Sequence, residues 1–155
     1  MTRTFGLFRL AGLLFLISAI SAAAGCDFGS NATPTAPDQS NVAFATTDLT
    51  VGTGTEATNG STATVTYGAW LYSESAADHK GTGLEQNQTS FVVGANQVIK
   101  GFDQGVAGMK VGGTRRIIVP PSLAYGSTGN QQIPPNAALV FDVALTSVVL
   151  AGGGS

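Results

Sequence analysis

The sequence is poor in charged side chains and in the residue types that most often perform covalent chemistry. Asp, Glu, Lys and Arg together make up 10% of the 155 residues, and the chain contains one histidine and one cysteine. One cysteine cannot form an internal disulfide, and the sequence has neither a cluster of metal ligands nor a Gly-x-Ser-x-Gly elbow. His79 lies in a polar segment that we expect to be a solvated loop. We therefore expect no bound metal, no cofactor and no Ser-His-Asp catalysis.

The chain also lacks a basic stripe. It carries seven basic and nine acidic residues, and two of the basic ones, Arg3 and Arg9, lie in a segment that we expect to be removed. Lys110, Arg115 and Arg116 flank a Gly-Gly pair and are expected to form a solvated face. Nucleic acid is not an expected partner, because its binding surfaces need clustered Lys and Arg. The scarcity of charge and the 21 glycines favour β structure in a single domain.

The first 25 residues have the pattern of an export signal, with a basic start, an apolar core over residues 10–20 and small residues before the cysteine. The apolar stretch is short for a transmembrane helix, which needs about 20 residues. The Ala-Ala-Gly-Cys sequence of residues 23–26 resembles the lipobox of bacterial lipoproteins, although that family prefers Leu at the position of Ala23. The resemblance implies that Cys26 is acylated and anchors the chain to a membrane. The alternative is an ordinary signal peptide with an incidental cysteine.

Composition divides the rest of the chain into three segments. Residues 26–46 are rich in Asn, Thr, Ser, Pro and Ala and cannot bury enough apolar surface to fold, so we expect a flexible tether. Residues 47–150 carry the periodic patterns of a folded domain, and residues 151–155 are expected to be a flexible tail. A lipid-anchored chain of this kind would face the periplasm or the extracellular side of the cell envelope.

Apolar positions two residues apart mark two long strands. They run from Ala63 to Leu71 and from Leu139 to Leu145, which is the period of strands with one buried face. Residues 115–119 predict a third strand, which ends at a Pro-Pro pair. Residues 49–52 and 90–93 predict two shorter strands.

A helical period is present only between residues 98 and 109. Val98, Phe102, Val106 and Met109 recur at helical spacing in a stretch that contains three glycines. Each glycine costs about 1 kcal/mol relative to alanine, so a helix of roughly ten residues here needs a packing partner. The apolar face of the sheet is available. The patterns together predict an α+β fold with an antiparallel sheet and one short helix packed on it.

Three motifs follow one another in the second half of the chain. They are Val98-Ile-Lys-Gly-Phe-Asp-Gln-Gly-Val-Ala-Gly-Met-Lys-Val-Gly-Gly113, Ile118-Val-Pro-Pro-Ser-Leu-Ala-Tyr-Gly126 and Ile133-Pro-Pro-Asn-Ala-Ala-Leu-Val-Phe-Asp-Val143. In this order they resemble the motifs of FKBP-type peptidyl-prolyl cis/trans isomerases. The resemblance covers about residues 47–149. It implies a strongly curved antiparallel sheet of five to six strands wrapped around one short helix.

The resemblance also assigns roles around a proline-binding pocket. The residues implied to be catalytic are Tyr67, Glu85, Ile99, Phe102 and Tyr125, and those implied to bind the substrate are Leu84, Phe91, Val98, Ile133 and Phe141. The Ile99 N–H and the Tyr125 hydroxyl would each hold the substrate by a hydrogen bond. From periodicity alone, the apolar and aromatic members of this set are ordinary core residues.

Four positions depart from the pattern of that family. Phe102 stands where Trp is most common, Leu84 stands for a pocket Phe, and Glu85 stands for an Asp that is shorter by one methylene. Thr89 falls where another aromatic is often found, and the segment from Glu85 to Phe91 is shorter than usual. We therefore expect one wall of the pocket to be less aromatic.

The implied activity is that of a monomeric peptidyl-prolyl cis/trans isomerase that acts on X-Pro bonds of exported or unfolded polypeptides. Macrolides of the type that binds the family are a further class of ligand to test. Isomerisation makes and breaks no covalent bond, so the lack of reactive side chains is compatible with it. One alternative is a proline-peptide-binding or chaperone module of the same fold with little turnover, and another is a structural lipoprotein.

Overall fold

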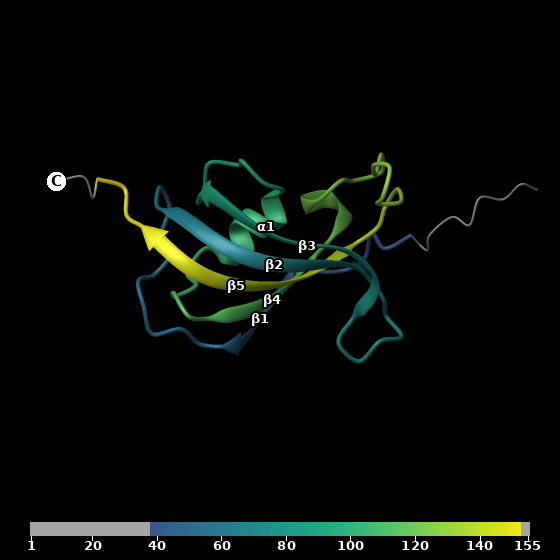
Figure 1. Cartoon of the computed structure of the whole chain (residues 1–155). Helices are drawn as coiled ribbons and strands as arrows, with labels where there is room; N and C mark the ends of the chain where they lie inside the picture. The colour runs from purple at the N-terminus through teal and green to yellow at the C-terminus, as the bar shows by residue number, and fades with distance from the viewer. Residues whose placement is uncertain (1–37, 153–155) are drawn as a thin grey trace, which may run out of the picture. The chain divides into compact units, whose positions relative to one another are not determined.

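The computed structural model describes residues 38–152, which form one antiparallel sheet of five strands and a short α-helix (Figure 1). Along the chain the elements are β1 (Ala45–Thr50), β2 (Thr62–Tyr72), β3 (Lys80–Val92), α1 (Lys100–Val106), β4 (Thr114–Val119), a 3-10 turn (Pro121–Leu123) and β5 (Leu139–Val149). The strands lie in the order β1-β4-β5-β2-β3, and every neighbouring pair is antiparallel. The predicted fold class, including the single short helix, is confirmed.

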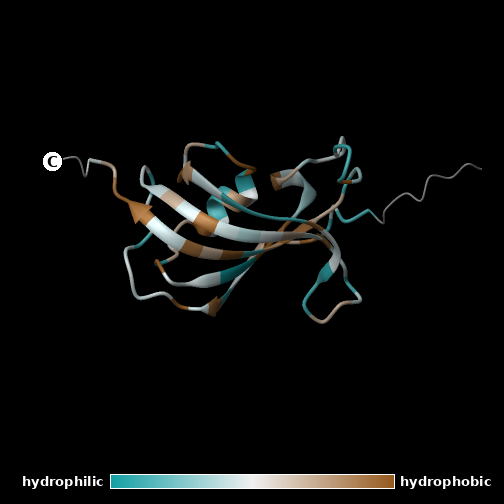
Figure 2. Cartoon of the chain, in the orientation of Figure 1, coloured by the Kyte–Doolittle hydropathy of each residue, from teal (hydrophilic) through white to brown (hydrophobic). Residues whose placement is uncertain are grey.

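The core lies between α1 and the face of the sheet that carries the predicted apolar positions. β5 contributes Leu139, Phe141, Val143 and Leu145, all of which are buried, and Val65 of β2 is fully buried beside them. Figure 2 shows the alternation of apolar and polar residues along β2 and β5. The apolar positions that recur every two residues in the sequence are therefore those on the buried face of the sheet.

Helix α1 is shorter than expected, and its glycines explain how it packs. It spans seven residues, against the roughly ten that the periodicity predicts. The helical conformation ends at Ala107, which has a ψ of 135°, and Gly108 follows with a φ of 77°. A Cβ on Gly101 would overlap the side chain of Val119, and a Cβ on Gly105 would overlap that of Ile117. The glycines thus let α1 approach β4 closely, and this packing offsets their low helix propensity.

Strand β3 is much longer than the short strand expected at residues 90–93. It pairs with β2 along its length, but the register is broken where Ala69 lies opposite Glu85 and Trp70 lies opposite Gly83. Leu84 is therefore an extra residue, a β-bulge. The sequence of this strand does not predict it, because the segment is rich in Gly, Gln and Thr and shows no clear alternation. Its strand conformation depends on the pairing with β2.

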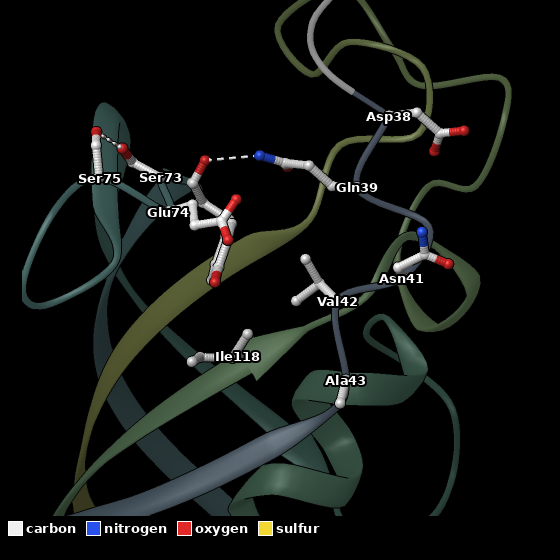
Figure 3. A pocket seen from close by; sticks show the side chains of 10 residues that line it. Asp38, Gln39, Asn41, Val42, Ala43, Ser73, Glu74, Ser75 and Ile118 are labelled. Atoms are coloured by element: carbon white, nitrogen blue, oxygen red, sulfur yellow. Dashed lines mark hydrogen bonds between the residues drawn. The ribbon is translucent and has the colours of Figure 1, made fainter.

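The fold also begins earlier than the predicted boundary at residue 47. β1 starts at Ala45, and the Gln39 side chain donates to the Tyr72 carbonyl at 3.0 Å and accepts from the Ala138 N–H at 2.8 Å. Figure 3 shows Gln39 reaching from the N-terminal segment toward the end of β2. Residues 39–46 thus belong to the folded unit rather than to a tether.

The predicted signal peptide, Cys26, the tether up to residue 37 and the last three residues of the tail lie outside the described residues. Among residues 38–152, no helix is long and apolar enough to cross a membrane.

Arg115 and Arg116 are not the solvated side chains that we expected. Arg115 donates to Asp48 Oδ1 at 2.6 Å and to the Gly105 carbonyl at 3.0 Å, so it joins β1 to the C-terminal end of α1. Arg116 donates to both carboxylate oxygens of Asp142, at 2.7 and 2.9 Å. Both arginines stand on β4, where neighbouring strands bring acidic partners that are distant in sequence.

The hairpin loop between β2 and β3 is held by its own contacts. The His79 ring stacks on Tyr72 with centroids 5.1 Å apart and planes at 12°. Its Nδ1 atom is buried and has no hydrogen-bond partner within residues 38–152. Lys80 pairs with Asp142 and lies 4.1 Å from the centre of the Trp70 ring. His79 is therefore partly buried, not the solvated loop residue that we expected.

Candidate functional site

A cavity of about 170 Å³ lies where β2, β3, β5, α1 and the loop after β4 meet. Four of its lining residues are aromatic, two are aliphatic and two are polar. They are Tyr67, Glu85, Thr89, Val98, Ile99, Phe102, Tyr125 and Phe141. All but Thr89 belong to the ten side chains predicted for a proline pocket, so the fold brings together residues spread over more than seventy positions of the chain.

The aromatic rings of this cavity pack edge to face around Phe102. The Phe102 ring lies 5.3 Å from that of Tyr67 and 5.1 Å from that of Phe141, with planes at 70° and 77°. Such T-shaped pairs contribute about 0.5–1.5 kcal/mol each beyond the area they bury. Phe102 is 3% exposed, so it forms the bottom of the cavity. The Phe91 ring packs against the Phe102 ring from the core side, with the two centroids 5.8 Å apart.

The single carboxylate that lines the cavity is bound to the partly buried phenol of Tyr67. The Tyr67 hydroxyl donates to Glu85 Oε1 at 2.7 Å. Burial, and next the hydrogen bond to Glu85, raise the pKa of Tyr67 to about 12. The phenol is therefore protonated at physiological pH and acts as a donor. Glu85 makes this contact from the residue that directly follows the bulge at Leu84.

The N-terminal end of α1 carries a free backbone donor. The Ile99 carbonyl accepts from the N–H groups of Phe102 and Asp103 at 3.0 and 3.1 Å. The N–H of Ile99 itself has no hydrogen-bond partner within the described part of the chain. Because Ile99 lines the cavity, this group is available to a carbonyl oxygen placed there.

Asp103 holds the segment that precedes Ile99, and sequence reasoning missed it. Its carboxylate is 4% exposed and accepts from the N–H groups of Gly94 at 2.7 Å and Asn96 at 3.0 Å. Both of those residues have positive φ values, 82° and 54°, so the turn that they form needs such support. The signal in the sequence was a carboxylate one residue after Phe102, next to the face of α1 that we expected to be buried.

The loop from Tyr125 to Ile133 forms the opposite rim. Tyr125 is 40% exposed and its hydroxyl has no partner among the described residues. Gly129 has a φ of 61°, and a Cβ there would overlap the Ile133 carbonyl, so only glycine allows the loop to close. Asn130 Oδ1 accepts from the N–H groups of Gln132 and Ile133, both at 2.8 Å. The loop is thus ordered by its own polar groups.

Three of the predicted substrate-binding residues do not line the cavity. Phe91 and Ile133 are buried in the core, and Leu84 packs against the core from the bulge. Thr89 occupies the wall between Glu85 and Phe91, where we expected less aromatic area. The pocket is therefore aromatic at its floor and polar along β3.

A larger groove of about 690 Å³ lies elsewhere, between the N-terminal segment and the hairpin loop (Figure 3). Polar residues make up most of its lining, including Asp38, Asn41 and Glu74, and Tyr72 is its single aromatic residue. It has no aromatic floor and shares no residue with the cavity around Phe102. Within residues 38–152, no three His, Cys, Asp or Glu side chains are grouped so that they could bind a metal ion.

Comparison with known proteins agrees with this geometry. Residues 53–146, more than half of the chain, match the model of the FKBP-type peptidyl-prolyl cis-trans isomerase family. The chain is 44% identical over 106 residues to the chloroplastic peptidyl-prolyl cis-trans isomerase FKBP16-4 of Arabidopsis thaliana, covering 65% of this chain and 46% of the relative. It is 41% identical over 103 residues to an FK506-binding protein of Neisseria meningitidis, covering 65% of this chain and 92% of the relative.

Two solved structures are similar as well. The structure of FkpA from Escherichia coli superposes with a TM-score of 0.59 at 31% identity, over 73% of this chain and 51% of that one. AtFKBP13 superposes with a TM-score of 0.57 at 30% identity, over 67% of this chain and 91% of that one. This chain spans less than half the length of several curated relatives that it matches. The matched segment, the strand order and the aromatic cavity together place the chain in the FKBP-type peptidyl-prolyl cis-trans isomerase family.

Proposed function

We propose that this protein catalyses cis/trans isomerisation of X-Pro peptide bonds in the cavity around Phe102. The observation that carries the proposal is the combination of an aromatic floor with an Ile99 N–H at its rim that has no partner in residues 38–152. A pyrrolidine ring fits an apolar cavity of about 170 Å³, and a carbonyl beside it needs a donor. Phe102, Tyr67 and Phe141 bind the ring, while Ile99 and Tyr125 bind the backbone next to it.

The chemistry requires no nucleophile. Rotation about the peptide bond faces a barrier of about 18–20 kcal/mol, because the resonance of the amide is lost in the twisted geometry. The two X-Pro ground states differ by only about 0.5–1 kcal/mol, so the barrier alone makes exchange slow. The twisted amide is less dipolar than the planar one, and an apolar cavity therefore favours it relative to water. Donors fixed at Ile99 and Tyr125 hold the substrate bent toward that geometry.

An NMR exchange assay on a short X-Pro peptide with the purified full chain tests the proposal. We expect exchange that grows with enzyme concentration, and a Phe102→Ala variant that loses most of it. Ser127→Ala, on the exposed part of the loop after Tyr125, is a matched control that leaves the floor intact. Exchange equal to the uncatalysed rate would show that the cavity does not act as an isomerase site.

A second candidate is a proline-peptide-binding or chaperone module with little turnover. Three departures from the family pattern favour it, at Leu84, Glu85 and Thr89. Of these, Glu85 and Thr89 line the cavity as polar side chains. Replacing a large apolar contact by a small one costs about 1–3 kcal/mol, or 10–200-fold. The double variant Leu84→Phe with Glu85→Asp restores the residues that are common in the family. A marked gain in rate is expected if these departures limit turnover, and no gain would count against that explanation.

We further propose that the substrates are exported polypeptides and that the chain acts from a lipid anchor on Cys26, as a monomer facing the periplasm or the extracellular side. The Ala-Ala-Gly-Cys sequence and the apolar segment before it support this location. Labelling with a radioactive fatty acid in the native cell tests it. We expect label in the wild type and none in Cys26→Ala, and equal labelling of both would argue against the anchor. Besides proline-containing polypeptides, macrolides are a class of ligand that we propose for the cavity around Phe102. Saturable binding of a macrolide would support this.

A further inference from the structure

Within residues 38–152, β3 is the last strand of the sheet and pairs with β2 alone (Figure 1). In an antiparallel ladder, alternate residues direct both of their backbone groups to the same side. The N–H of Gln88 bonds the side chain of Asn87 at 2.8 Å, and the N–H of Val92 bonds the side chain of Gln97 at 2.9 Å. Neither group therefore serves the ladder with β2. The even-numbered residues of this stretch direct their backbone groups away from β2, and we call this side of residues 86–92 the β3 outer edge.

Two donors on the β3 outer edge have no partner. The alternation places the N–H groups of Gln86 and Ser90 on this side, and neither makes a hydrogen bond within residues 38–152. The donor between them, Gln88, and the one after Ser90, Val92, are already bound by neighbouring side chains, which leaves free donors four residues apart. An exposed backbone donor of this kind is a ready partner for another extended chain.

The edge also lacks the features that usually protect a free strand. Residues 86–91 include no charged residue and no proline, and the bulge lies before this stretch, at Leu84. Natural edge strands are commonly blocked by lysine, proline or a bulge. From Gln86 to Val92 the pairing with β2 is regular, so the backbone presents an even, extended template.

The β3 outer edge is continuous with the candidate site. Glu85 and Thr89, both on β3, line the cavity around Phe102. Ser90 directly follows Thr89, so a free donor of the edge lies one residue from the wall of the cavity. The residues that flank a proline placed on Phe102 are therefore within reach of this strand.

We propose that the β3 outer edge is a second subsite, at which an extended segment flanking the proline adds to the sheet as a further strand. The inference rests on the proposed function and adds to it the way in which the enzyme holds a long substrate. The occupant is an uncharged, extended stretch of polypeptide, because the edge carries no charge to pair with. Backbone hydrogen bonds recognise no particular side chain, so the subsite suits unfolded chains of varied sequence.

The test compares peptides of two lengths with the full chain. One is short and carries only the X-Pro core, and the others add about seven uncharged residues before or after it, enough to follow residues 86–92 at about 3.3 Å per residue. We expect kcat/KM to rise about tenfold for one of the long peptides, which corresponds to two or three backbone hydrogen bonds. No gain with either flank would overturn the subsite.

A variant pair tests whether the edge is responsible. Ser90→Pro removes the free N–H and blocks the edge, whereas it spares the ladder because this N–H does not face β2. Ser90→Ala is the matched control, since it removes only the hydroxyl that contacts Thr64 at 2.8 Å. The long-to-short ratio should fall toward one in the proline variant and stay at the wild-type value in the alanine variant. A ratio that persists in a folded Ser90→Pro protein, as judged by its melting curve, would refute the proposal.

A modified substrate makes the test independent of protein folding. N-methylation of alternate flanking residues removes substrate donors, and in one of the two alternating patterns it should abolish the gain. Loss in neither pattern would overturn strand addition, as would sedimentation data showing that the edge pairs with a second copy of this chain. If the short peptide is not isomerised at all, the proposed function fails, and the edge is then judged by the ratio of the two peptides' binding constants.

Discussion

Replacing Gly105 by alanine should destabilise the protein, although alanine is the better helix former. A Cβ at this position would lie 2.7 Å from Ile117 Cγ2 and 2.9 Å from Cγ1, and it would overlap Cδ1 as well. Ile117 is fully buried on β4, so a shift of its side chain would press on other atoms of the core. The gain in helix propensity is about 1 kcal/mol, whereas overpacking of a tight core costs about 1–3 kcal/mol.

We therefore expect a net loss of about 1 kcal/mol in the free energy of unfolding and a fall of about 4 °C in the melting temperature. Urea unfolding followed by circular dichroism measures the first and a thermal scan the second. Gln104→Ala is the control on the same helix, because Gln104 is exposed and its replacement changes propensity alone. Adding Ile117→Val removes the Cδ1 methyl, so the double variant should lose less stability than the sum of the two single variants. A Gly105→Ala protein as stable as the wild type would refute the close packing of α1 on β4.

Three further predictions concern polar groups. Asp103→Ala should free the turn before Ile99 and lower kcat/KM about tenfold. It should also reduce the free energy of unfolding by roughly 1–3 kcal/mol, because buried N–H groups are left unpaired. An isomerase assay and a melting curve on the same sample measure both effects, and an unchanged rate would show that Asp103 does not support the site. Burial opposes ionisation of Asp142, but Arg116 and Lys80 outweigh it and hold its pKa below the ordinary 3.8. Ionised Asp142 stabilises the folded protein above pH 3.8, and this stabilisation is lost as the pH falls through the lower pKa of the folded state. Asp142→Asn should therefore lower the free energy of unfolding by about 1–2 kcal/mol at neutral pH and by less near pH 3. Urea unfolding at the two pH values measures the difference. The pKa of Tyr67 is raised to about 12, first by burial and then by its bond to the neighbouring carboxylate. Between pH 10.0 and about 12 the unfolded chain loses the proton of the Tyr67 hydroxyl, while the folded chain keeps it. The free energy of unfolding therefore falls as the pH rises through this range. A Tyr67→Phe variant should lose less stability over the same range in denaturant titrations.

The strands with one buried face were predictable from the sequence, whereas the edge strand β3 was not. In β2 and β5 apolar and polar residues alternate because one face of the sheet is buried and the other faces solvent. A period of two in the sequence is therefore enough to predict these strands. β3 lies at the edge, and its residues between Lys80 and Ser90 are mostly exposed on both faces. Selection for apolar side chains is weak there, so its only determinant is the backbone pairing with β2.

The site shows the same division. The aromatic floor and the helix end were predictable, because the motifs around Phe102, Tyr125 and Phe141 resemble those of a known family. The contacts that support them were not, since Asp103 acts on a turn nine residues earlier and Gln39 reaches across about a hundred residues to Ala138. The hydrogen-bond partner of a side chain depends on which segments lie side by side in the folded protein. A single sequence does not show which distant segments are neighbours.

The amino-acid sequence by itself determined the class of fold, the position of the short helix and the kind of chemistry, because periodicity and the absence of reactive groups are local properties. Only the tertiary structure decided that Arg115 and Arg116 bind acidic partners rather than water, that Gly105 is needed for contact with Ile117, and that β3 leaves free donors next to the cavity. Those outcomes depend on distances between segments far apart in the chain, and the packing of the sheet against α1 sets those distances.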